Sequence, residues 1–488
     1  MMKIFIIVIG LIALWSSECS AALFKGGGVE ISTQPRNIIN LATTNLVALY
    51  SVIQQTNYSG ACLRVQRSTD NAQQDIGFVD GICDIVSAMS FAGGGTARVV
   101  KWYDQSGNGR NSTQSTFTRA PVLSNTNLIN SIPGITFPIR SRTQLSIPSS
   151  VSVSTQSQTV ISIQSMIAPR ASLGAVWQIG STAGTKNALV PLVNNDVISD
   201  PSSSLNTLIY SLSQPQVSVL TSSASTKTYQ MNSILRTGLA ASSAQTSTGG
   251  SIGSAFYGQV YLLAVYSSVV PQSTIDTSVA SLQSTFRIVT NPAAWIVFDG
   301  DSITEGLLTT LGVNNPFQLA PQLSHSIWMR NIGISGQTLA TSLANETVRV
   351  VNAFNPTITK NIVVMGGGEA DICNAGASAT TVFNNLKIYI SNAKAAGYEV
   401  VVATLIFDLN VPNGCTDGST RDVVRQDYNT MVIANASSLG YSVVDYDSIP
   451  ELQAPQTPGY SADGIHPTSA GYALMAAKLA PVINALLP

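Results

Sequence analysis

Residues 295–304 read Trp-Ile-Val-Phe-Asp-Gly-Asp-Ser-Ile-Thr, and this stretch decides the fold of the C-terminal half. Its apolar beginning predicts a buried strand, and the polar residues that follow mark the point where the strand turns into a helix. Ser302 is therefore expected at the carboxyl end of a strand, where the ligand sites of open α/β sheets lie. By itself the Gly-Asp-Ser sequence also fits a plain turn with a serine N-cap.

The chain downstream alternates apolar runs with helical patterns. Further strands are predicted over residues 361–365, 399–406 and 441–446, and helices over 379–396, 420–439 and 468–487. Strands that alternate with helices predict a parallel sheet covered on both faces. We place this three-layer α/β domain at residues 293–488.

The chain upstream differs in composition and in the pattern of its apolar residues. From about residue 35 to 270 it is rich in Ser, Thr, Gln and Gly, with short alternating runs at 159–166, 216–220 and 257–266. Many short strands separated by turn residues predict an all-β sandwich. A helical pattern at 273–286 and the break at Thr290-Asn291-Pro292 close this domain, which we place at residues 36–288.

The composition and the N-terminus indicate an extracellular protein. The net charge is −1 and only 10% of the residues are charged, so no broad field favours nucleic acid or an acidic membrane surface. Lys3, an apolar run to Trp15 and small residues up to Ala22 predict a signal peptide over residues 1–21. The alternative, a membrane anchor, needs roughly 20 apolar residues. We expect secretion and no membrane span, and the oligomeric state stays open.

The cysteines predict disulfides. If Cys19 leaves with the signal peptide, an even number remains, as is usual in a secreted chain. Three pairings are possible, and we favour Cys62–Cys83 and Cys373–Cys415 because each pair stays within one domain. No Cys-x-x-Cys or His cluster predicts a metal site. Glycosylation sequons stand at Asn57, Asn111, Asn345 and Asn435.

Further motifs follow the first along the C-terminal half. They are Asn-Ile-Gly-Ile-Ser-Gly-Gln-Thr at 331–338, Gly-Gly-Gly-Glu-Ala-Asp at 366–371 and Asp-Gly-Ile-His-Pro at 463–467. A serine nucleophile needs a base, usually a histidine that a carboxylate orients. The chain has 2 histidines. His466 has Asp463 on the same loop, whereas His325 is expected on the surface or in packing.

Together these motifs resemble the SGNH (GDSL-type) hydrolase superfamily over about residues 293–488. The resemblance implies a flavodoxin-like domain in which Ser302 is the nucleophile, Asp463 and His466 complete the triad, and the N–H groups of Ser302 and Gly336 bind the oxyanion. No cofactor is implied. The third motif of the family is Gly-x-Asn-Asp, and here Ala370 replaces the Asn that donates a third hydrogen bond.

The missing donor has a predictable cost. Removing one oxyanion donor typically costs about 2.7–4 kcal/mol, or roughly 10²–10³ in turnover. Asn374 or Gln337 is a candidate substitute amide. The site is therefore expected to be a slowed hydrolase, and a degenerate binding domain remains the alternative.

The N-terminal half resembles the catalytic domain of α-L-arabinofuranosidase B and its lectin-like relatives. The resemblance rests on residues 64–71, 74–78 and 100–111, which include Lys-Trp-Tyr-Asp-Gln-Ser-Gly at 101–107. Retaining glycosidases need two carboxyl groups. In that family a Glu is the nucleophile, but the chain has no Glu between Ile31 and Thr304. Candidate replacements are Asp196, Asp200 and Asp276.

The sequence thus predicts a secreted serine esterase that removes acyl groups from a polysaccharide, with a carbohydrate-binding β-sandwich in front. Two alternatives stay open. One is arabinofuranosidase activity in the N-terminal domain. The other is a non-catalytic extracellular lectin with a degenerate hydrolase domain.

Overall fold

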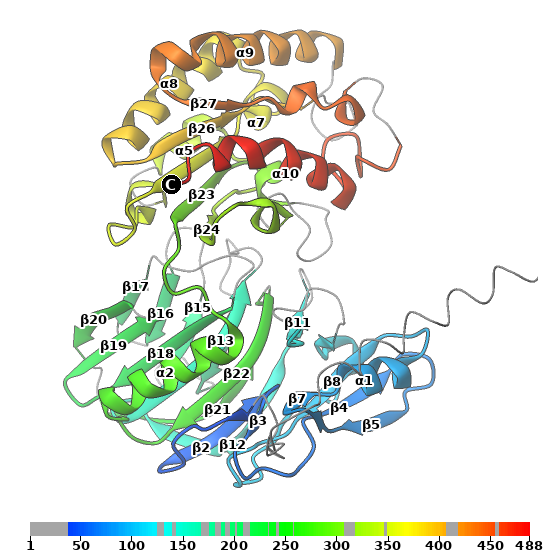
Figure 1. The fold of residues 1–488 in the computed structure, drawn as a ribbon, viewed down its shortest axis with the longest axis vertical. Coiled ribbons are helices and arrows are strands. Elements are labelled where there is room, and N and C mark those ends of the chain that lie inside the picture. The colour runs from blue at the N-terminus through cyan, green and yellow to red at the C-terminus, as the bar shows by residue number, and fades with distance from the viewer. Residues whose placement is uncertain are drawn as a thin grey trace, which may run out of the picture. The chain divides into compact units, whose positions relative to one another are not determined.

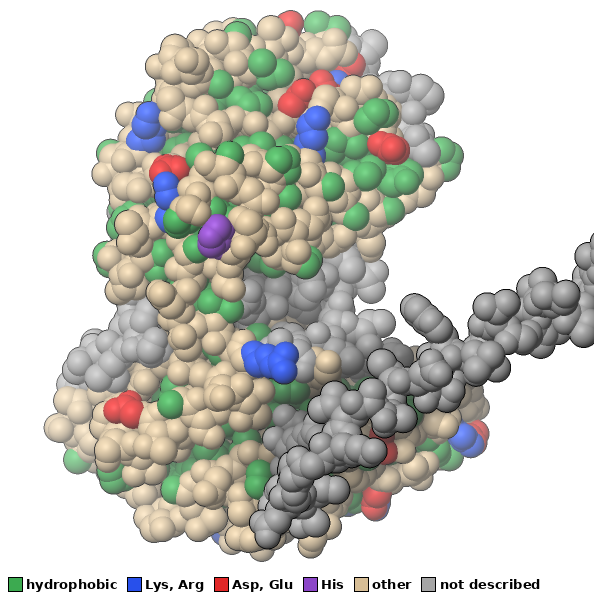
Figure 2. Space-filling model, in the orientation of Figure 1, with side chains coloured by type: hydrophobic (Ala, Val, Ile, Leu, Met, Phe, Trp, Pro, Cys, Tyr) green, Lys and Arg blue, Asp and Glu red, His purple; other side chains and the backbone are tan. Residues whose placement is uncertain are grey.

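The structure is a computed structural model of the chain. It describes residues 38–123, 131–138, 143–166, 175–180, 187–190, 196–200, 203–207, 215–232, 234–240, 244–256, 258–306, 318–345, 349–406, 418–453 and 458–488. The chain has the two-domain architecture that the sequence predicts, with a β-rich N-terminal domain and an α/β C-terminal domain (Figure 1). On the face that Figure 2 shows, charged side chains are few and scattered, as the charged fraction of 10% leads one to expect. The predicted signal peptide lies outside the described residues.

The N-terminal domain is built mainly from antiparallel strands. Its helices are α1 (Ile85–Ala92), α2 (Gln272–Phe286) and the 3-10 turn η1 (Phe117–Arg119). Its strands are β1 (Ile38–Ile39), β2 (Leu46–Ser51), β3 (Gln54–Gln55), β4 (Leu63–Arg67), β5 (Gln73–Ile76), β6 (Phe78–Val79), β7 (Ile82–Cys83), β8 (Ala97–Trp102), β9 (Ser112–Thr113), β10 (Val122–Leu123), β11 (Ile135–Phe137), β12 (Leu145–Ser154), β13 (Gln158–Met166), β14 (Trp177–Ile179), β15 (Asn187–Val190), β16 (Asp196–Asp200), β17 (Ser203–Thr207), β18 (Gln216–Ser222), β19 (Thr226–Met231), β20 (Ile234–Ala240), β21 (Thr246–Ile252) and β22 (Gly258–Tyr266).

Strand β22 lies at the centre of this domain. It pairs with β2, β11 and β13, and every one of its residues is buried. Helix α2 buries the four apolar residues of its predicted face, Ile275, Val279, Leu282 and Phe286. The ring of Phe286 meets Tyr261 of β22 edge-on at 5.8 Å between centroids. The predicted helix and the strands at 159–166 and 216–220 are confirmed, and the strand predicted at 257–266 is confirmed from Gly258 on, because residue 257 lies outside the described residues.

One of the two predicted disulfides lies in this domain. Cys62, just before β4, is joined to Cys83 in β7, with the two Cα atoms 5.8 Å apart. Cys373 is also disulfide-bonded. Cys415 lies outside the described residues, so its pairing with Cys373 stays a prediction.

The C-terminal domain contains a five-stranded parallel sheet in the order β24-β23-β25-β26-β27. The strands are β23 (Ala294–Gly300), β24 (Ile327–Asn331), β25 (Asn361–Gly366), β26 (Glu399–Ala403) and β27 (Ser442–Val444). The helices are α3 (Ser302–Glu305), η2 (Ala320–Gln322), α5 (Leu339–Ala344), η3 (Val351–Ala353), α7 (Glu369–Cys373), α8 (Ala379–Ala395), α9 (Gly418–Leu439), η4 (Tyr446–Ser448), η5 (Pro450–Leu452) and α10 (Ser469–Asn484).

The helices form two groups around this sheet. Helix α8 packs against α5 and α9, whereas α10 packs against β27 and η2 and α3 packs against β23 (Figure 1). The predicted strands at 361–365 and 441–446 and the three long predicted helices are present, with ends shifted by a few residues. This arrangement is the covered parallel sheet that the β-α alternation predicts.

The structure differs from the sequence prediction at two strands. Strand β24 was not predicted, because its five residues include the polar Arg330 and Asn331, which interrupt the apolar pattern. The strand predicted at 399–406 ends at Ala403. Beyond it, the N–H of Leu405 donates to the side chain of Asn429 instead of continuing a strand ladder.

Candidate active site

The turn from β23 into α3 places Ser302 at the first position of the helix. Gly300 has a φ of +155°, and a Cβ atom there would lie 2.3 Å from Oγ1 of Thr304 and 2.6 Å from the carbonyl oxygen of Gly366. Only glycine therefore lets β23 end this close to β25. The Asp301 side chain caps the helix by accepting a hydrogen bond of 3.0 Å from the N–H of Ile303.

Ser302, His466 and Asp463 form a continuous hydrogen-bonded chain. Nε2 of His466 lies 2.8 Å from Oγ of Ser302, and Nδ1 lies 2.8 Å from Oδ2 of Asp463. The histidine ring thus bridges a hydroxyl and a carboxylate through its two nitrogens. This is the geometry that serine nucleophiles require of a general base and its orienting acid.

The loop that carries the histidine is held by its own backbone. Oδ1 of Asp463 accepts hydrogen bonds from the N–H groups of Ile465 and His466, at 3.0 and 2.8 Å. The N–H of Ala462 donates to the carbonyl oxygen of His466 at 2.8 Å. One carboxylate therefore both folds the loop and orients the imidazole.

Helix α10 fixes this loop against the serine. Thr468 caps the helix, and the hydroxyl of Tyr472 donates to the carbonyl oxygen of Ile303 in α3 at 2.7 Å. The two elements that carry the serine and the histidine are thereby joined directly by a buried side chain.

The pKa of Asp463 is lowered from its ordinary value. Burial acts to raise it, but the hydrogen bonds from the backbone and the ring of His466 and from the N–H of Ile465 outweigh burial. Asp463 is therefore ionised at neutral pH and can stabilise a positive charge on the ring.

The second motif forms a loop beside the serine. Gly333 approaches α3 so closely that a Cβ atom would lie 2.6 Å from the backbone nitrogen of Glu305. Oε2 of Glu305 accepts a hydrogen bond of 2.7 Å from the N–H of Ser335. Asn331 adds a second link, because its Nδ2 donates to the carbonyl oxygen of Thr304 at 2.7 Å. The loop is thus fixed to the helix that carries Ser302.

Gly336 in this loop is suited to receive an oxyanion. Its φ of +75° favours glycine, and no heavy atom lies within 4 Å of a Cβ built on it. Among the described residues, its N–H donates to no backbone carbonyl. An N–H that no backbone carbonyl accepts, in a loop fixed to the helix of Ser302, is a candidate oxyanion donor.

Ala370 stands where the family resemblance places an Asn donor, and its methyl side chain cannot donate a hydrogen bond. It lies in α7, directly after β25, and is 5% exposed. The amide of Gln337 is buried and donates to Ser342 and, at 3.5 Å, to Asp299, so it is already engaged. Asn374 is exposed at the C-terminal end of α7. The structure therefore does not supply a replacement through Gln337.

Buried carboxylates lie behind the serine, and sequence reasoning did not identify them. Asp299, at the end of β23, is fully buried and pairs with Arg349 at 2.8 Å, while Tyr389 donates to it at 3.1 Å. Burial and the nearby charge of Asp371 raise the pKa of Asp301 to about 7, against hydrogen bonds from backbone N–H groups. The available signal was the position of both acids directly after an apolar strand.

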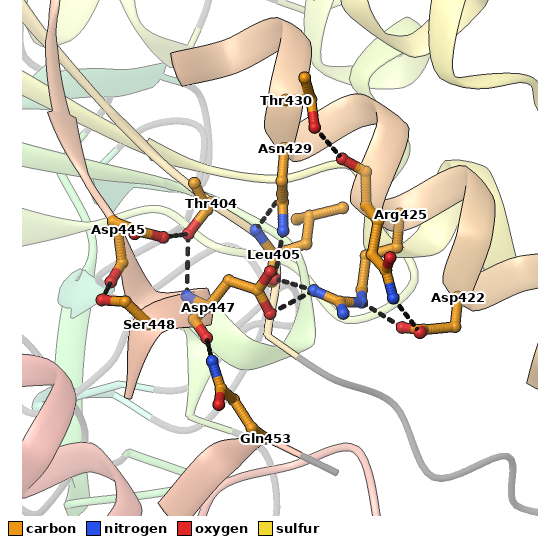
Figure 3. A network of polar contacts seen from close by, with 11 residues as sticks. Thr404, Leu405, Asp422, Arg425, Asn429, Thr430, Asp445, Asp447, Ser448 and Gln453 are labelled. Carbon is orange, nitrogen blue, oxygen red and sulfur yellow. Dashed lines mark hydrogen bonds and ion pairs between the residues drawn. The ribbon is translucent and has the colours of Figure 1, made fainter. Parts of the chain in front are cut away.

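A polar network fixes the chain where β26 ends (Figure 3). Arg425 of α9 is buried, donates to the carbonyl oxygen of Leu405 at 2.8 Å, and pairs with Asp422 and Asp447. Nδ2 of Asn429 donates to the same carbonyl oxygen at 2.8 Å. The N–H of Thr404 still donates to the carbonyl oxygen of Val444 in β27 at 3.0 Å, and from Leu405 on the chain is anchored to α9.

The other predicted residues are not part of this chain of contacts. His325 is exposed, with Nδ1 2.9 Å from Oγ of Ser324, as expected of a surface histidine. Asp276 lies exposed on α2, and Asp196 and Asp200 lie in β16. Of the sequon residues, Asn57 and Asn345 are exposed, while Asn111 and Asn435 are half-buried.

Two absences hold for the part of the chain that the structure describes. In it, no group of three His, Cys, Asp or Glu side chains is arranged to hold a metal ion. No described helix is both long and apolar enough to cross a bilayer.

Two family models match the chain. Residues 298–474 match the GDSL-like lipase/acylhydrolase family, and residues 35–136 match the catalytic domain of α-L-arabinofuranosidase B. A search of curated proteins returned no match. The arabinofuranosidase match ends well before α2, so it covers only the first part of the β-rich domain.

Solved structures resemble each half. A lipolytic protein of the G-D-S-L family from Veillonella parvula is 24% identical over 39% of this chain and 97% of its own, with a TM-score of 0.34. A GDSL-like lipase from Bacteroides thetaiotaomicron is 25% identical over 40% and 90%, with a TM-score of 0.33. A GH54 α-L-arabinofuranosidase is 15% identical over 50% of this chain and 64% of its own, with a TM-score of 0.41.

Proposed function

We propose that residues 298–474, which match the GDSL-like lipase/acylhydrolase family, hydrolyse esters with Ser302 as nucleophile, His466 as general base and Asp463 as orienting acid. The observation that carries the proposal is the hydrogen-bonded chain from Oγ of Ser302 through both ring nitrogens of His466 to Asp463.

The reaction begins with transfer of the Ser302 hydroxyl proton to Nε2 of His466. The serine oxygen attacks the ester carbonyl carbon, and the carbonyl oxygen becomes an oxyanion next to the N–H groups of Ser302 and Gly336. Collapse of this intermediate breaks the ester bond, and His466 returns the proton to the departing alcohol oxygen. The product at this stage is an acyl group on Ser302.

Water completes the cycle by the same route. His466 takes a proton from water, the hydroxide attacks the acyl carbon, and collapse returns the proton to the serine oxygen and releases the acid. Asp463 holds the ring with Nδ1–H toward its carboxylate and stabilises the imidazolium that forms in each half. The lowered pKa of Asp463 supports this role because the carboxylate stays charged at neutral pH.

The substrate class follows from the other domain. The match of residues 35–136 to a domain of a sugar-cleaving enzyme supports a carbohydrate partner for the β-rich half. We therefore propose acyl esters of polysaccharide, such as acetyl esters, as substrates of the hydrolase domain. The N-terminal sequence supports secretion, which would bring the protein to such polymers outside the cell.

Cleavage of arabinose side chains is the second candidate, and the arabinofuranosidase match favours it. It requires two carboxyl groups on either side of a glycosidic bond. Asp276, one of the candidates, is exposed on α2 and accepts a hydrogen bond of 2.8 Å from Gln272. This environment is that of a solvated helix surface, and we rank this activity below ester hydrolysis.

A serine-directed phosphonate probe tests the main proposal. Labelling of the wild-type chain at Ser302, lost in Ser302→Ala, is expected together with hydrolysis of p-nitrophenyl acetate. His466→Ala should lose hydrolysis as well, because the hydroxyl then lacks a base. Unchanged hydrolysis in either folded variant would refute the assignment. Release of p-nitrophenol from an arabinofuranoside by Ser302→Ala would instead support the glycosidase.

A further inference from the structure

A polar groove lies on the β-rich domain, on strands unrelated to the hydrolase triad. It has a volume of about 280 Å³, close to the lower end of the range for small-molecule sites. The groove crosses β4, β5, β8, β9 and β12. The residues that line it are Arg64, Gln73, Val100, Lys101, Thr113, Gln114, Ser115 and Ser146.

The sheet register explains why these residues meet. Arg64 is directly opposite Lys101, Lys101 is opposite Thr113, and Thr113 is opposite Ser146. Residues directly opposite in an antiparallel pair point to the same face of the sheet. The four side chains therefore form one row across the strands, which we call the Lys101 row. It is polar along its whole length.

A β-bulge shapes the centre of this row. Arg64 pairs with Lys101 while Val65 pairs with Val99, so Val100 is the additional residue on β8. Such bulges bend a strand and redirect the neighbouring side chain. Lys101 is the residue next to the bulge, and Val100 itself reaches the groove wall.

The charges in the groove do not cancel. Nε and Nη2 of Arg64 donate to the two carboxylate oxygens of Asp75 at 2.7 and 2.8 Å, so this pair is neutral as a unit. Lys101 forms no ion pair among the described residues. Its Nζ lies 5.2 Å from the ring centroid of Tyr103, whose hydroxyl donates to Asp75 at 2.7 Å. The carboxylate of Asp75 also interacts with the charge of Lys101, but it is already paired with Arg64, so Arg64, Lys101 and Asp75 together carry a net charge of +1.

The remaining lining groups are neutral. Thr113, Ser115 and Ser146 are exposed, and their hydroxyls donate to and accept from no other described residue. Gln114 is fixed in place, because its Nε2 donates to the carbonyl oxygen of Gln144 at 2.9 Å. The groove thus offers one ammonium group, which can bind a carboxylate, and hydroxyl and amide groups, which can bind sugar hydroxyls. A ligand with one carboxylate and several hydroxyls fits these groups.

We propose that this groove binds a uronic acid residue of a polysaccharide, with the carboxylate on Lys101 and the sugar hydroxyls on Thr113, Ser115 and Ser146. The inference rests on the proposed carbohydrate-binding role of the β-rich domain and adds the charge class of the sugar. Nucleic acid is disfavoured, because polyanion binding uses several unpaired cations and the groove has one.

The test measures binding of trigalacturonic acid and of neutral xylotriose to the full-length Ser302→Ala chain by titration calorimetry at low salt. Trigalacturonic acid should bind and xylotriose should bind at least about tenfold more weakly, as loss of one charge-assisted contact predicts. Binding of the acidic sugar should weaken at high salt, because salt screens an exposed charge pair. Equal binding of both sugars, or no binding of either, would overturn the proposal.

Two lysine variants complete the test. Lys101→Met keeps the apolar stem over Tyr103 and removes only the charge, so it should weaken trigalacturonate binding about tenfold. The matched control is Lys387→Met, since Nζ of Lys387 also lies over a ring, 5.7 Å from the centroid of Phe383. This control should bind as the parent does. An equal loss in both variants, or no loss in Lys101→Met, would exclude Lys101 as the carboxylate contact.

The esterase activity separates this proposal from the proposed function. In an otherwise wild-type chain, Lys101→Met should hydrolyse p-nitrophenyl acetate at the wild-type rate, because no residue that lines the groove belongs to the triad. A chain that binds trigalacturonate but hydrolyses no ester would refute only the hydrolase. A chain that hydrolyses the ester but ignores both sugars would refute only the groove.

Discussion

Ala370→Asn is the substitution that tests the oxyanion site most directly. Strands β23 and β25 are neighbours in register, with Gly300 opposite Gly366, and the chain turns into a helix after each of them. Ser302 and residue 370 therefore belong to adjacent turns at one edge of the sheet. An amide at position 370 is expected to add a hydrogen-bond donor to the oxyanion.

The size of the effect follows from what such donors contribute. Removal of one donor from a complete oxyanion hole costs about 2.7–4 kcal/mol, or roughly 10²–10³ in turnover. The added amide enters a site that formed without it, so we expect a gain of about 10- to 100-fold in kcat. The gain should appear in kcat rather than KM, because the donor acts on charge that develops only in the transition state.

The assay is steady-state hydrolysis of p-nitrophenyl acetate by wild type, Ala370→Asn and Ala370→Leu. Leu has nearly the shape of Asn without its amide, and because residue 370 is 5% exposed, this variant controls for crowding. Circular dichroism and thermal melting check that each variant is folded. A folded Ala370→Asn that is no faster than wild type would refute the view that the site lacks only a donor. A large loss in Asn374→Ala would show that another amide already acts there.

The remaining predictions concern the charges of the site. Asp463→Asn should lower kcat for p-nitrophenyl acetate by about 10⁴, because the ring loses its orienting carboxylate, and a loss under tenfold would contradict the assignment. Asp301 has its pKa raised to about 7 from 3.8, so its contribution to stability is full below about pH 4 and is lost as the pH rises to about 7. Denaturant unfolding at several pH values should therefore show a decline over this range that Asp301→Asn reduces, and an equal slope in both proteins would disprove it. Arg349→Met should cost about 3–5 kcal/mol of unfolding free energy, because it leaves the buried carboxylate of Asp299 unpaired, and a loss below about 1 kcal/mol would contradict the pairing.

The second disulfide stays a sequence prediction that peptide mapping can test. Non-reducing digestion should link Cys373 to Cys415 in a single cross-linked peptide, as it should link Cys62 to Cys83. A link between the two domains would contradict the pairing.

The sequence by itself determined the elements and the chemistry that depend on short-range pattern. Apolar runs gave β23 and β25, helical spacing gave α2, α8 and α9, and the pair Asp463 and His466 stood three residues apart on one loop. The family resemblance also singled out Gly336, whose φ of +75° is one that side chains rarely adopt. Such features depend on residues that are close in sequence, so they can be predicted without a structure.

The tertiary structure decided everything that depends on distant neighbours. Ser302 and His466 are 164 residues apart in the chain, and only the parallel sheet with α10 beside it brings them to 2.8 Å. In the same packed domain, Gln337 is buried and donates to Ser342, and Arg349 is buried against Asp299. The sheet also includes β24, which the sequence did not predict because polar residues interrupt its apolar pattern. Side-chain partners and burial depend on which surfaces pack together in the folded chain. The local sequence pattern does not specify which distant segments come into contact.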